Sequence, residues 1–135
     1  ILSGLKITDK NSIKEVAQKF HDLGIKIVII TGVKFVDDTP DFSHIFISNG
    51  ISNYIIKTKE YSYSTPISGT GDLFSAVYLG YYLSTSDYIT ALQKTVIAVN
   101  RVAYNTFQSK ERELQILSVD YRNLAVVDSD IDVLK

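Results

Sequence analysis

A short glycine turn that runs straight into an apolar segment is the feature that most constrains this chain. The stretch reads S-G-T-G-D-L-F-S-A and covers residues 68–76. Gly69 and Gly71 let the backbone adopt conformations that other residues avoid, and they let a ligand approach closely. A helix that begins here points its unpaired N–H groups, and the positive end of its dipole, at the space above the turn. That space should attract an anion, and phosphate is the anion that such helix starts typically bind.

Asp72 follows the turn directly, where its charge would repel a bound phosphate. The carboxylate makes sense if it takes a proton from a hydroxyl group that attacks the phosphate. The amides of Gly69, Thr70 and Gly71 would then stabilise the charge that develops on the transferred group. These residues therefore predict phosphoryl transfer. Short glycine motifs are weak signals, so the spacing alone leaves a second interpretation open, in which G-T-G-D is only a loop before a helix.

Composition narrows the class of protein. The chain has 135 residues, which suits a single domain with one core. Its 14 basic and 15 acidic residues give a net charge of −1, with no basic run of the kind that nucleic-acid binding requires. Cysteine is absent, which fits a reducing cytosol, and no window approaches the roughly 20 apolar residues of a membrane span. We therefore expect a cytoplasmic protein that binds neither nucleic acid nor membrane.

The first third of the chain predicts an α/β arrangement. Apolar residues recur on one helical face over 12–23, with Ser12 and Glu15 as a capping box and Gly24 as the stop. The segment 26–31, K-I-V-I-I-T, is β-branched and apolar on both faces. This pattern is typical of a buried strand in a parallel sheet.

The middle of the chain predicts a hairpin and then two helices. Two strand-like runs over 44–57 flank Asn49-Gly50, which favours a type I′ turn. Residues 72–83 are apolar almost all round, as in a helix sunk between layers. A longer amphipathic helix is predicted over 87–107.

The C-terminal part gives weaker signals. The run E-L-Q-I-L-S-V, residues 113–119, suits either a short helix or a strand. The last ten residues are predicted as a loose tail.

Histidines and clustered carboxylates predict no catalytic or metal site of their own. His21 and His44 show neither a Ser-His-Asp spacing nor a paired-His motif, so structural roles are expected for both. Asp37, Asp38 and Asp41 lack the spacing and the glycine of a calcium loop. We interpret them as part of a solvated loop.

Four stretches together resemble the ribokinase-like superfamily, and within it most closely the pyridoxal (pyridoxine, pyridoxamine) kinases. They are L-S-G-L-K-I-T-D at 2–9, I-V-I-I-T-G at 27–32, S-G-T-G-D-L-F-S-A at 68–76 and E-R-E-L-Q-I-L-S-V-D-Y-R-N-L at 111–124. Sugar kinases of the superfamily generally lack the E-L-Q segment. The sister hydroxymethylpyrimidine kinases usually carry Cys at the position of Asp72.

The resemblance implies both a fold and an activity. The fold is the C-terminal portion of a three-layer α/β/α sandwich, with a β-hairpin near 44–57 and two long helices near 72–107. The activity is ATP-dependent phosphorylation of the 5′-hydroxyl of pyridoxal, pyridoxine or pyridoxamine, with ATP arriving with Mg²⁺. Two alternatives remain: a hydroxymethylpyrimidine or sugar kinase of the same superfamily, and a non-catalytic module that binds nucleotide or another subunit.

Residue by residue, the resemblance makes Asp72 the base that contacts the substrate hydroxyl. It makes Gly69, Thr70 and Gly71 the anion hole for the γ-phosphate. The residues implied to line the ATP site are Thr31, Gly32, Lys57, Thr58, Val99 and Asn100. The resemblance leaves open which residues around 57–60 contact the nucleotide. Lys57 and Lys59 could meet the ATP phosphates or could protect a sheet edge from unwanted pairing. No residue of this chain is implied as a metal ligand.

The resemblance also concerns length, because such kinases are about twice as long as this chain. Residues 1–135 are expected to form one partial domain, the nucleotide-binding and catalytic half, without the N-terminal half that supplies the pyridine pocket. Since phosphoryl transfer depends on positioning, we expect negligible kinase activity from this half alone. Its apolar strand 26–31 would then form an unprotected sheet edge, which predicts a homodimer.

Overall fold

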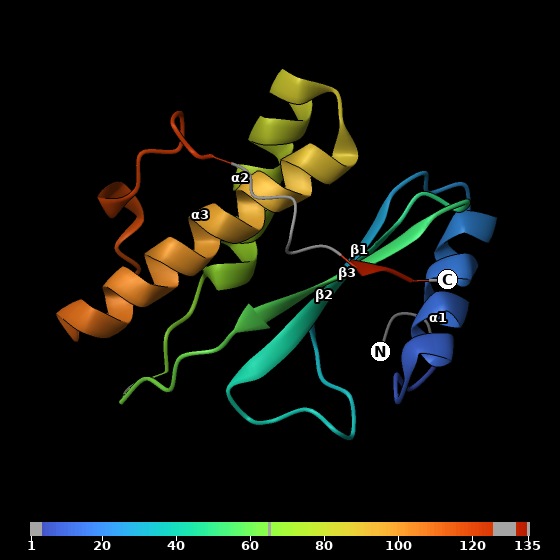
Figure 1. Cartoon of the computed structure of the whole chain (residues 1–135), viewed down its shortest axis with the longest axis horizontal. Helices are drawn as coiled ribbons and strands as arrows, with labels where there is room; N and C mark the ends of the chain where they lie inside the picture. The colour runs from blue at the N-terminus through green and yellow to red at the C-terminus, as the bar shows by residue number, and fades with distance from the viewer. Residues whose placement is uncertain (1–3, 65, 126–131, 135) are drawn as a thin grey trace. The chain divides into compact units, whose positions relative to one another are not determined.

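The computed structural model describes residues 4–64, 66–125 and 132–134, and it confirms the predicted α/β class (Figure 1). The elements in chain order are α1 (Lys10–Asp22), β1 (Val28–Val33), β2 (Phe42–Ser48), β3 (Asn53–Lys59), α2 (Thr70–Thr85), α3 (Tyr88–Ser109), the 3-10 helix η1 (Ile116–Ser118) and β4 (Asp132–Val133). The chain divides into two compact units, each described by itself below. Unit 1 comprises Ile1–Glu60 and Asp130–Lys135, and unit 2 comprises Tyr61–Ser129.

Helix α1 begins earlier than predicted because Asp9 caps it. The Asp9 carboxylate accepts hydrogen bonds from the backbone N–H of Asn11 (2.9 Å) and Ser12 (2.8 Å), and Ser12 Oγ accepts one from the Asp9 N–H (3.0 Å). The predicted capping box of Ser12 with Glu15 is therefore wrong, since Ser12 is the third helical residue and not the cap. The bond from the Ser12 backbone lowers the pKa of Asp9. Gly24, at φ +88, confirms the predicted stop.

The sheet of unit 1 has the strand order β1-β2-β3-β4, and each pair is antiparallel. The predicted strand 26–31 exists as β1, shifted to Val28–Val33. Parallel pairing is not found among the strands of the described residues, where β1 pairs with β2 through Val28↔Ser48 and Ile30↔Phe46. Strand β1 lies at the edge of this sheet, as predicted.

The predicted hairpin is confirmed, but its turn is not type I′. Strands β2 and β3 pair from Phe42↔Lys59 to Ser48↔Asn53, which leaves four residues in the connection. Gly50 has φ +86, whereas Asn49 does not share the left-handed conformation that a type I′ turn requires. Asn49 Oδ1 instead accepts hydrogen bonds from the N–H groups of Ile51 (3.0 Å) and Ser52 (2.7 Å). The side chain thus closes a longer turn.

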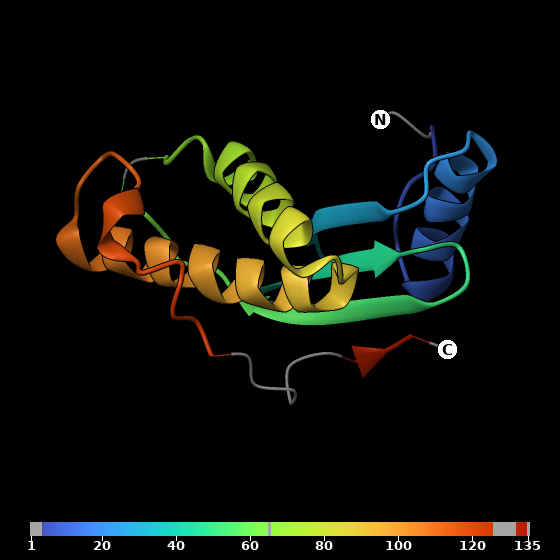
Figure 2. The same cartoon turned by 90° about the horizontal axis from the view of Figure 1, so that it is seen from above.

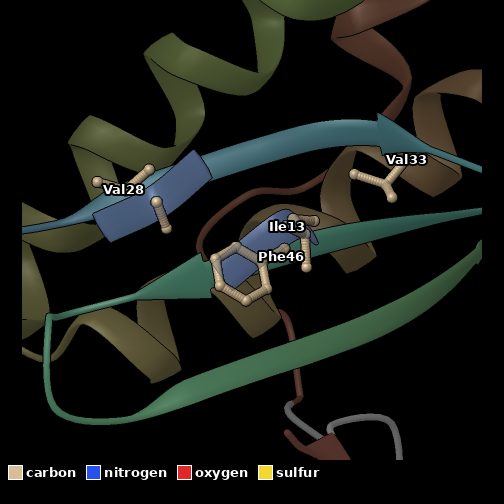
Figure 3. Close-up of a cluster of buried hydrophobic side chains, with 5 residues drawn as sticks. Ile13, Val28, Val33 and Phe46 are labelled. Carbon is tan, nitrogen blue, oxygen red and sulfur yellow. The ribbon is translucent and has the colours of Figure 1, made fainter. Parts of the chain in front are cut away.

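The core of unit 1 lies between α1 and the first two strands (Figure 3). Ile13 and Phe46 are fully buried at its centre, and their side chains lie close together in the close-up. The other buried members are Ala17, Val28 and Val33. Burial of these apolar groups is the main stabilising contribution that fixes α1 on the sheet.

Unit 2 is built on α2 and α3, which pack against each other (Figure 2). They confirm the helices predicted over 72–83 and 87–107. Asp87 caps α3 by accepting a hydrogen bond from the Thr90 N–H at 2.8 Å. Hydrogen bonding from the Thr90 side chain, and secondly from this N–H, lowers the pKa of Asp87. The expectation that α2 is sunk on all sides is wrong, because Phe74 is its only buried residue while Leu79 and Leu83 are 56% and 73% exposed.

The structure decides between the alternatives left open for residues 113–119 and describes part of the predicted tail. Of the two structures left open for residues 113–119, a short helix is found, the 3-10 helix η1. The predicted loose tail falls partly on 126–131 and 135, outside the described residues. Its described part instead forms β4, which pairs with β3, and the Leu134 N–H donates to the Asn53 carbonyl at 2.8 Å. None of the helices in the described ranges is long and apolar enough to cross a membrane.

Candidate functional site

The glycine turn of unit 2 forms the N-terminus of α2. Gly69 is the N-cap, with φ +89 and ψ 0, and its carbonyl accepts a hydrogen bond from the Leu73 N–H at 2.9 Å. The helical amides of Thr70, Gly71 and Asp72 lie ahead of this first helical bond and have no acceptor within the helix. This set of three donors is shifted by one residue from the predicted Gly69, Thr70 and Gly71, because Gly69 is the N-cap. All four turn residues are exposed. The turn therefore presents three backbone donors at the positive end of the helix dipole.

Each glycine of the turn has its own reason to be there. Gly69 adopts a left-handed conformation that L side chains rarely take. Gly71 has ordinary helical geometry, but a Cβ placed on it would meet no atom within 4 Å, so the space beside it is open. A ligand can therefore approach the backbone closely at Gly71.

Asp72 is the one acidic residue in the first turn of α2. Its exposed carboxylate stands beside the three amides, as the sequence predicts for a base acting at an anion-binding turn. A carboxylate at this place also interacts favourably with the helix dipole. The geometry thus accommodates a proton acceptor next to an anion.

Val99 and Asn100 lie half-buried on α3, in the same unit as the turn. A cavity of about 400 Å³ in this unit is lined further along the helix, beyond these two residues. Its lining includes Tyr63 and Phe107, whose rings meet edge to face with centroids 6.3 Å apart. The Tyr63 hydroxyl donates to the Ala103 carbonyl at 3.0 Å, and burial raises the pKa of Tyr63. This cavity was not predictable from the residue pattern, because it depends on contacts between residues 40 positions apart, such as Tyr63 and Ala103.

Thr31 and Gly32 lie in unit 1, within β1 and not at its end as predicted. Ile30 pairs with Phe46 and Val33 pairs with His44, so these two residues face a single residue of β2. This is a β-bulge, with Gly32 at φ +67. Both residues are exposed. A bulge redirects side chains at a sheet edge, so the alternation of β1 is interrupted at Thr31 and Gly32.

Lys57 and Thr58 lie next to each other in β3, but only the side chain of Lys57 is exposed to solvent. Lys57 is exposed, and its Nζ lies 4.3 Å from the centroid of the Phe42 ring. Thr58 is 7% exposed, and its hydroxyl shares a hydrogen bond of 3.1 Å with Ser43 Oγ. The side chain of Thr58 is thus engaged within the sheet, whereas the side chain of Lys57 lies exposed over the Phe42 ring.

The histidines have structural surroundings. His21 Nδ1 lies 2.7 Å from the Ile25 carbonyl and Nε2 lies 2.9 Å from Ser48 Oγ, which confirms the structural role predicted for it. His44 Nδ1 approaches Asp38 Oδ2 at 3.2 Å without hydrogen-bond geometry. Asp38 also accepts the Phe35 N–H at 2.6 Å, so this carboxylate holds its loop together and is not simply solvated.

No group of three or more potential metal-ligating side chains occurs in the described parts of the chain. Of the predicted site residues, six lie in unit 2, namely Gly69, Thr70, Gly71, Asp72, Val99 and Asn100. The other four, Thr31, Gly32, Lys57 and Thr58, lie in unit 1. The four turn residues Gly69–Asp72 are consecutive and together form the start of α2.

An exposed helix start with an adjacent carboxylate, in an α/β protein, is the arrangement that the resemblance to the ribokinase-like superfamily predicts. The family model described as phosphomethylpyrimidine kinase matches residues 1–116. The chain belongs to this family.

Relatives and solved structures agree with the assignment. The pyridoxal kinase PdxY of Corynebacterium diphtheriae is 25% identical over 116 residues, which cover 86% of this chain and 40% of that protein. The Plasmodium falciparum PdxK structure with ligands AMP-PNP and PL is 26% identical, with a TM-score of 0.72 over 87% of this chain and 39% of that one. Leishmania donovani pyridoxal kinase in complex with ADP is 21% identical and has the same fold, with a TM-score of 0.77 over 98% of this chain and 46% of that one. The predicted resemblance to ribokinase-like pyridoxal kinases is confirmed.

The chain spans less than half the length of each of these proteins: 40% of the Corynebacterium relative, 39% of the Plasmodium structure and 46% of the Leishmania structure.

Proposed function

We propose that this chain carries the ATP-binding and phosphoryl-transfer part of a pyridoxal kinase, which phosphorylates the 5′-hydroxyl of pyridoxal, pyridoxine or pyridoxamine. The observation that carries the proposal is the exposed turn Gly69–Asp72, where three amides without helical acceptors adjoin one carboxylate. Relatives named as pyridoxal kinases, including one structure with AMP-PNP and PL, support the substrates. A cytoplasmic location is part of the proposal, and a chain without cysteine is compatible with it.

In this mechanism the amides of Thr70, Gly71 and Asp72 hold the γ-phosphate and stabilise the charge that develops on it. The Asp72 carboxylate accepts the proton of the attacking hydroxyl. Thr31 and Gly32 at the bulge of β1, together with Lys57, are proposed to contact the ATP phosphates, and Val99 and Asn100 to contact adenine. Thr58 would contribute through its backbone, since its hydroxyl is bonded to Ser43.

Magnesium is proposed to reach the site with ATP. In this proposal the ion is bound mainly through phosphate oxygens and water. The ion would neutralise phosphate charge, while the chain's own residues position the phosphate and the proton acceptor.

A second candidate substrate is hydroxymethylpyrimidine, which the description of the matching family favours. The same turn would serve it, because the anion hole and the base act on the transferred phosphate and on a primary hydroxyl in either reaction. Parallel assays with pyridoxal and hydroxymethylpyrimidine as acceptors distinguish the two substrates.

Titration of the chain with MgATP by calorimetry tests the anion hole. We expect the parent chain to bind, and Thr70→Pro to weaken binding by about tenfold or more, because a hydrogen bond to a charged group contributes about 1.5–3 kcal/mol. Proline lacks the N–H donor yet is tolerated at the first position of a helix, so α2 should persist.

The matched control is Thr70→Ala, which removes the side chain and keeps the amide, and it should bind MgATP as the parent does. Equal binding by Thr70→Pro and Thr70→Ala would contradict the anion hole. A folded parent chain that binds nothing at millimolar MgATP would contradict the proposed nucleotide site.

We further propose that the chain forms a homodimer through unit 1. Strand β1 is the edge of the described sheet, and an apolar groove along it is lined by Ile27, Ile29 and Ile30, with Phe20 and Ile25 beside them. An apolar edge without charged residues pairs readily with another chain. Light scattering should give twice the monomer mass, and Ile29→Lys should restore the monomer. A monodisperse monomer for the parent chain would contradict the proposal.

A further inference from the structure

Gly69 is supported from behind by a leucine that lies 45 positions later in the sequence. A Cβ built on Gly69 would lie 3.7 Å from Leu114 Cδ1, which is ordinary van der Waals distance. Leu114 therefore occupies the space on the inner side of the turn. Together with Leu73, from the first turn of α2, it packs against the buried cluster of Ala98, Val102, Val119 and Leu124. The glycine turn and the C-terminal segment thus rest on the same part of α3.

The backbone next to Leu114 is tied to α3 through a buried threonine. The Gln115 N–H donates to Thr106 Oγ1 at 3.0 Å, and the Thr106 hydroxyl donates to the Val102 carbonyl at 2.7 Å. Thr106 is fully buried, so neither bond competes with water. These two bonds fix the position of the backbone next to Leu114, and so the position from which its side chain extends.

The residues after Leu114 are anchored as well. Asn105 Nδ2 donates to Ser118 Oγ at 2.8 Å, which joins α3 to the end of η1. The Tyr121 hydroxyl donates to the Ile116 carbonyl at 2.7 Å, and the Tyr81 hydroxyl of α2 donates to the Tyr121 carbonyl. The segment behind the glycine turn is therefore held by both helices of unit 2.

We propose that Leu114 is a positioning residue for phosphate binding, which keeps Gly69 in its left-handed conformation and so aims the amides of Thr70, Gly71 and Asp72. The inference rests on the proposed function, because it assigns phosphate to this turn. A turn fixed before the ligand arrives loses little conformational freedom on binding. Without the leucine behind it, the turn would have to be ordered by the ligand, and affinity would fall.

The test compares Leu114→Ala with Leu117→Ala, a matched control on the same segment whose side chain is 96% exposed. Hydrogen exchange of the Leu73 amide reports the turn, because this amide bonds to the Gly69 carbonyl. The Val102 amide, on a fully buried residue in the interior of α3, reports opening of the whole unit. We expect Leu114→Ala to speed exchange at Leu73 by about tenfold relative to Val102, and Leu117→Ala to change neither.

The second measurement is the affinity for MgATP. It should fall by about tenfold in Leu114→Ala and recover in Leu114→Met, because methionine restores most of the side-chain volume. Parallel acceleration at Leu73 and Val102 would overturn the proposal, because it would show general support of the unit. Unchanged exchange at Leu73 would overturn it too. The exchange measurement needs no nucleotide, so it decides the positioning role even if the parent binds no MgATP, a result that would contradict the proposed function instead.

Discussion

Replacing Asp72 with Asn is expected to lower kcat for phosphoryl transfer by about 100- to 10,000-fold, the usual contribution of a positioned general base. Asparagine keeps the shape of the side chain but accepts no proton at neutral pH. The affinity for MgATP should be unchanged or slightly higher, because the substitution removes a negative charge beside the phosphates. A loss confined to kcat would show that Asp72 acts on the reaction and not on nucleotide binding.

Transfer from ATP to pyridoxal is measured for the chain alone and for the chain mixed with the remaining part of the Corynebacterium diphtheriae relative. The second polypeptide is included because the match covers only 40% of that relative. Asp87→Asn is the matched control, since Asp87 is also a carboxylate at a helix start and Asn preserves the cap. An unchanged kcat in Asp72→Asn would contradict the role of Asp72 as general base. Absence of phosphoryl transfer in the mixture that contains the parent chain would contradict the proposed kinase activity.

The elements that the sequence predicted correctly depend on local signals. The glycine after α1, the break between α2 and α3 and the hairpin about Gly50 all follow from residues close to one another in the chain. The wrong predictions, the cap of α1 and the turn type of the hairpin, concern residues that can serve in two different local structures. Ser12 suits a cap by type, but Asp9 accepts two backbone bonds there. Asn49 suits a left-handed turn position, but its side chain caps two amides instead.

The candidate site likewise contains parts that depend on consecutive residues and parts that depend on contacts made only in the fold. The turn Gly69–Asp72 was predictable because all its parts are consecutive and because glycine spacing has a direct backbone meaning. The bulge at Thr31 and Gly32 was not, since it exists only in the register between β1 and β2. The support from Leu114 and Thr106 was equally hidden, since a leucine and a threonine carry no signal until the fold brings them to the turn.

The largest expected effect on stability is that of Phe46→Ala in unit 1. Phe46 is fully buried at the centre of the cluster in Figure 3, against Ile13 and beside Val28 and Val33. Truncation of such a side chain removes its transfer free energy and leaves a cavity, at a cost of about 3–5 kcal/mol. Since domains are stable by only about 5–15 kcal/mol, much of the stability of unit 1 should be lost.

Urea unfolding followed by hydrogen exchange at the paired amides of β2 and β3 measures this loss within unit 1 itself. Ile51→Ala is the control, because Ile51 belongs to the same hairpin but is 90% exposed, and its truncation should change the free energy of unfolding by less than about 0.5 kcal/mol. A cost for Phe46→Ala as small as that of the control would mean that α1 does not close over β1 and β2 in solution. The apolar groove along β1 is lined partly by Val16 and Phe20 of α1, so the same result would also remove the surface through which we propose that two chains pair.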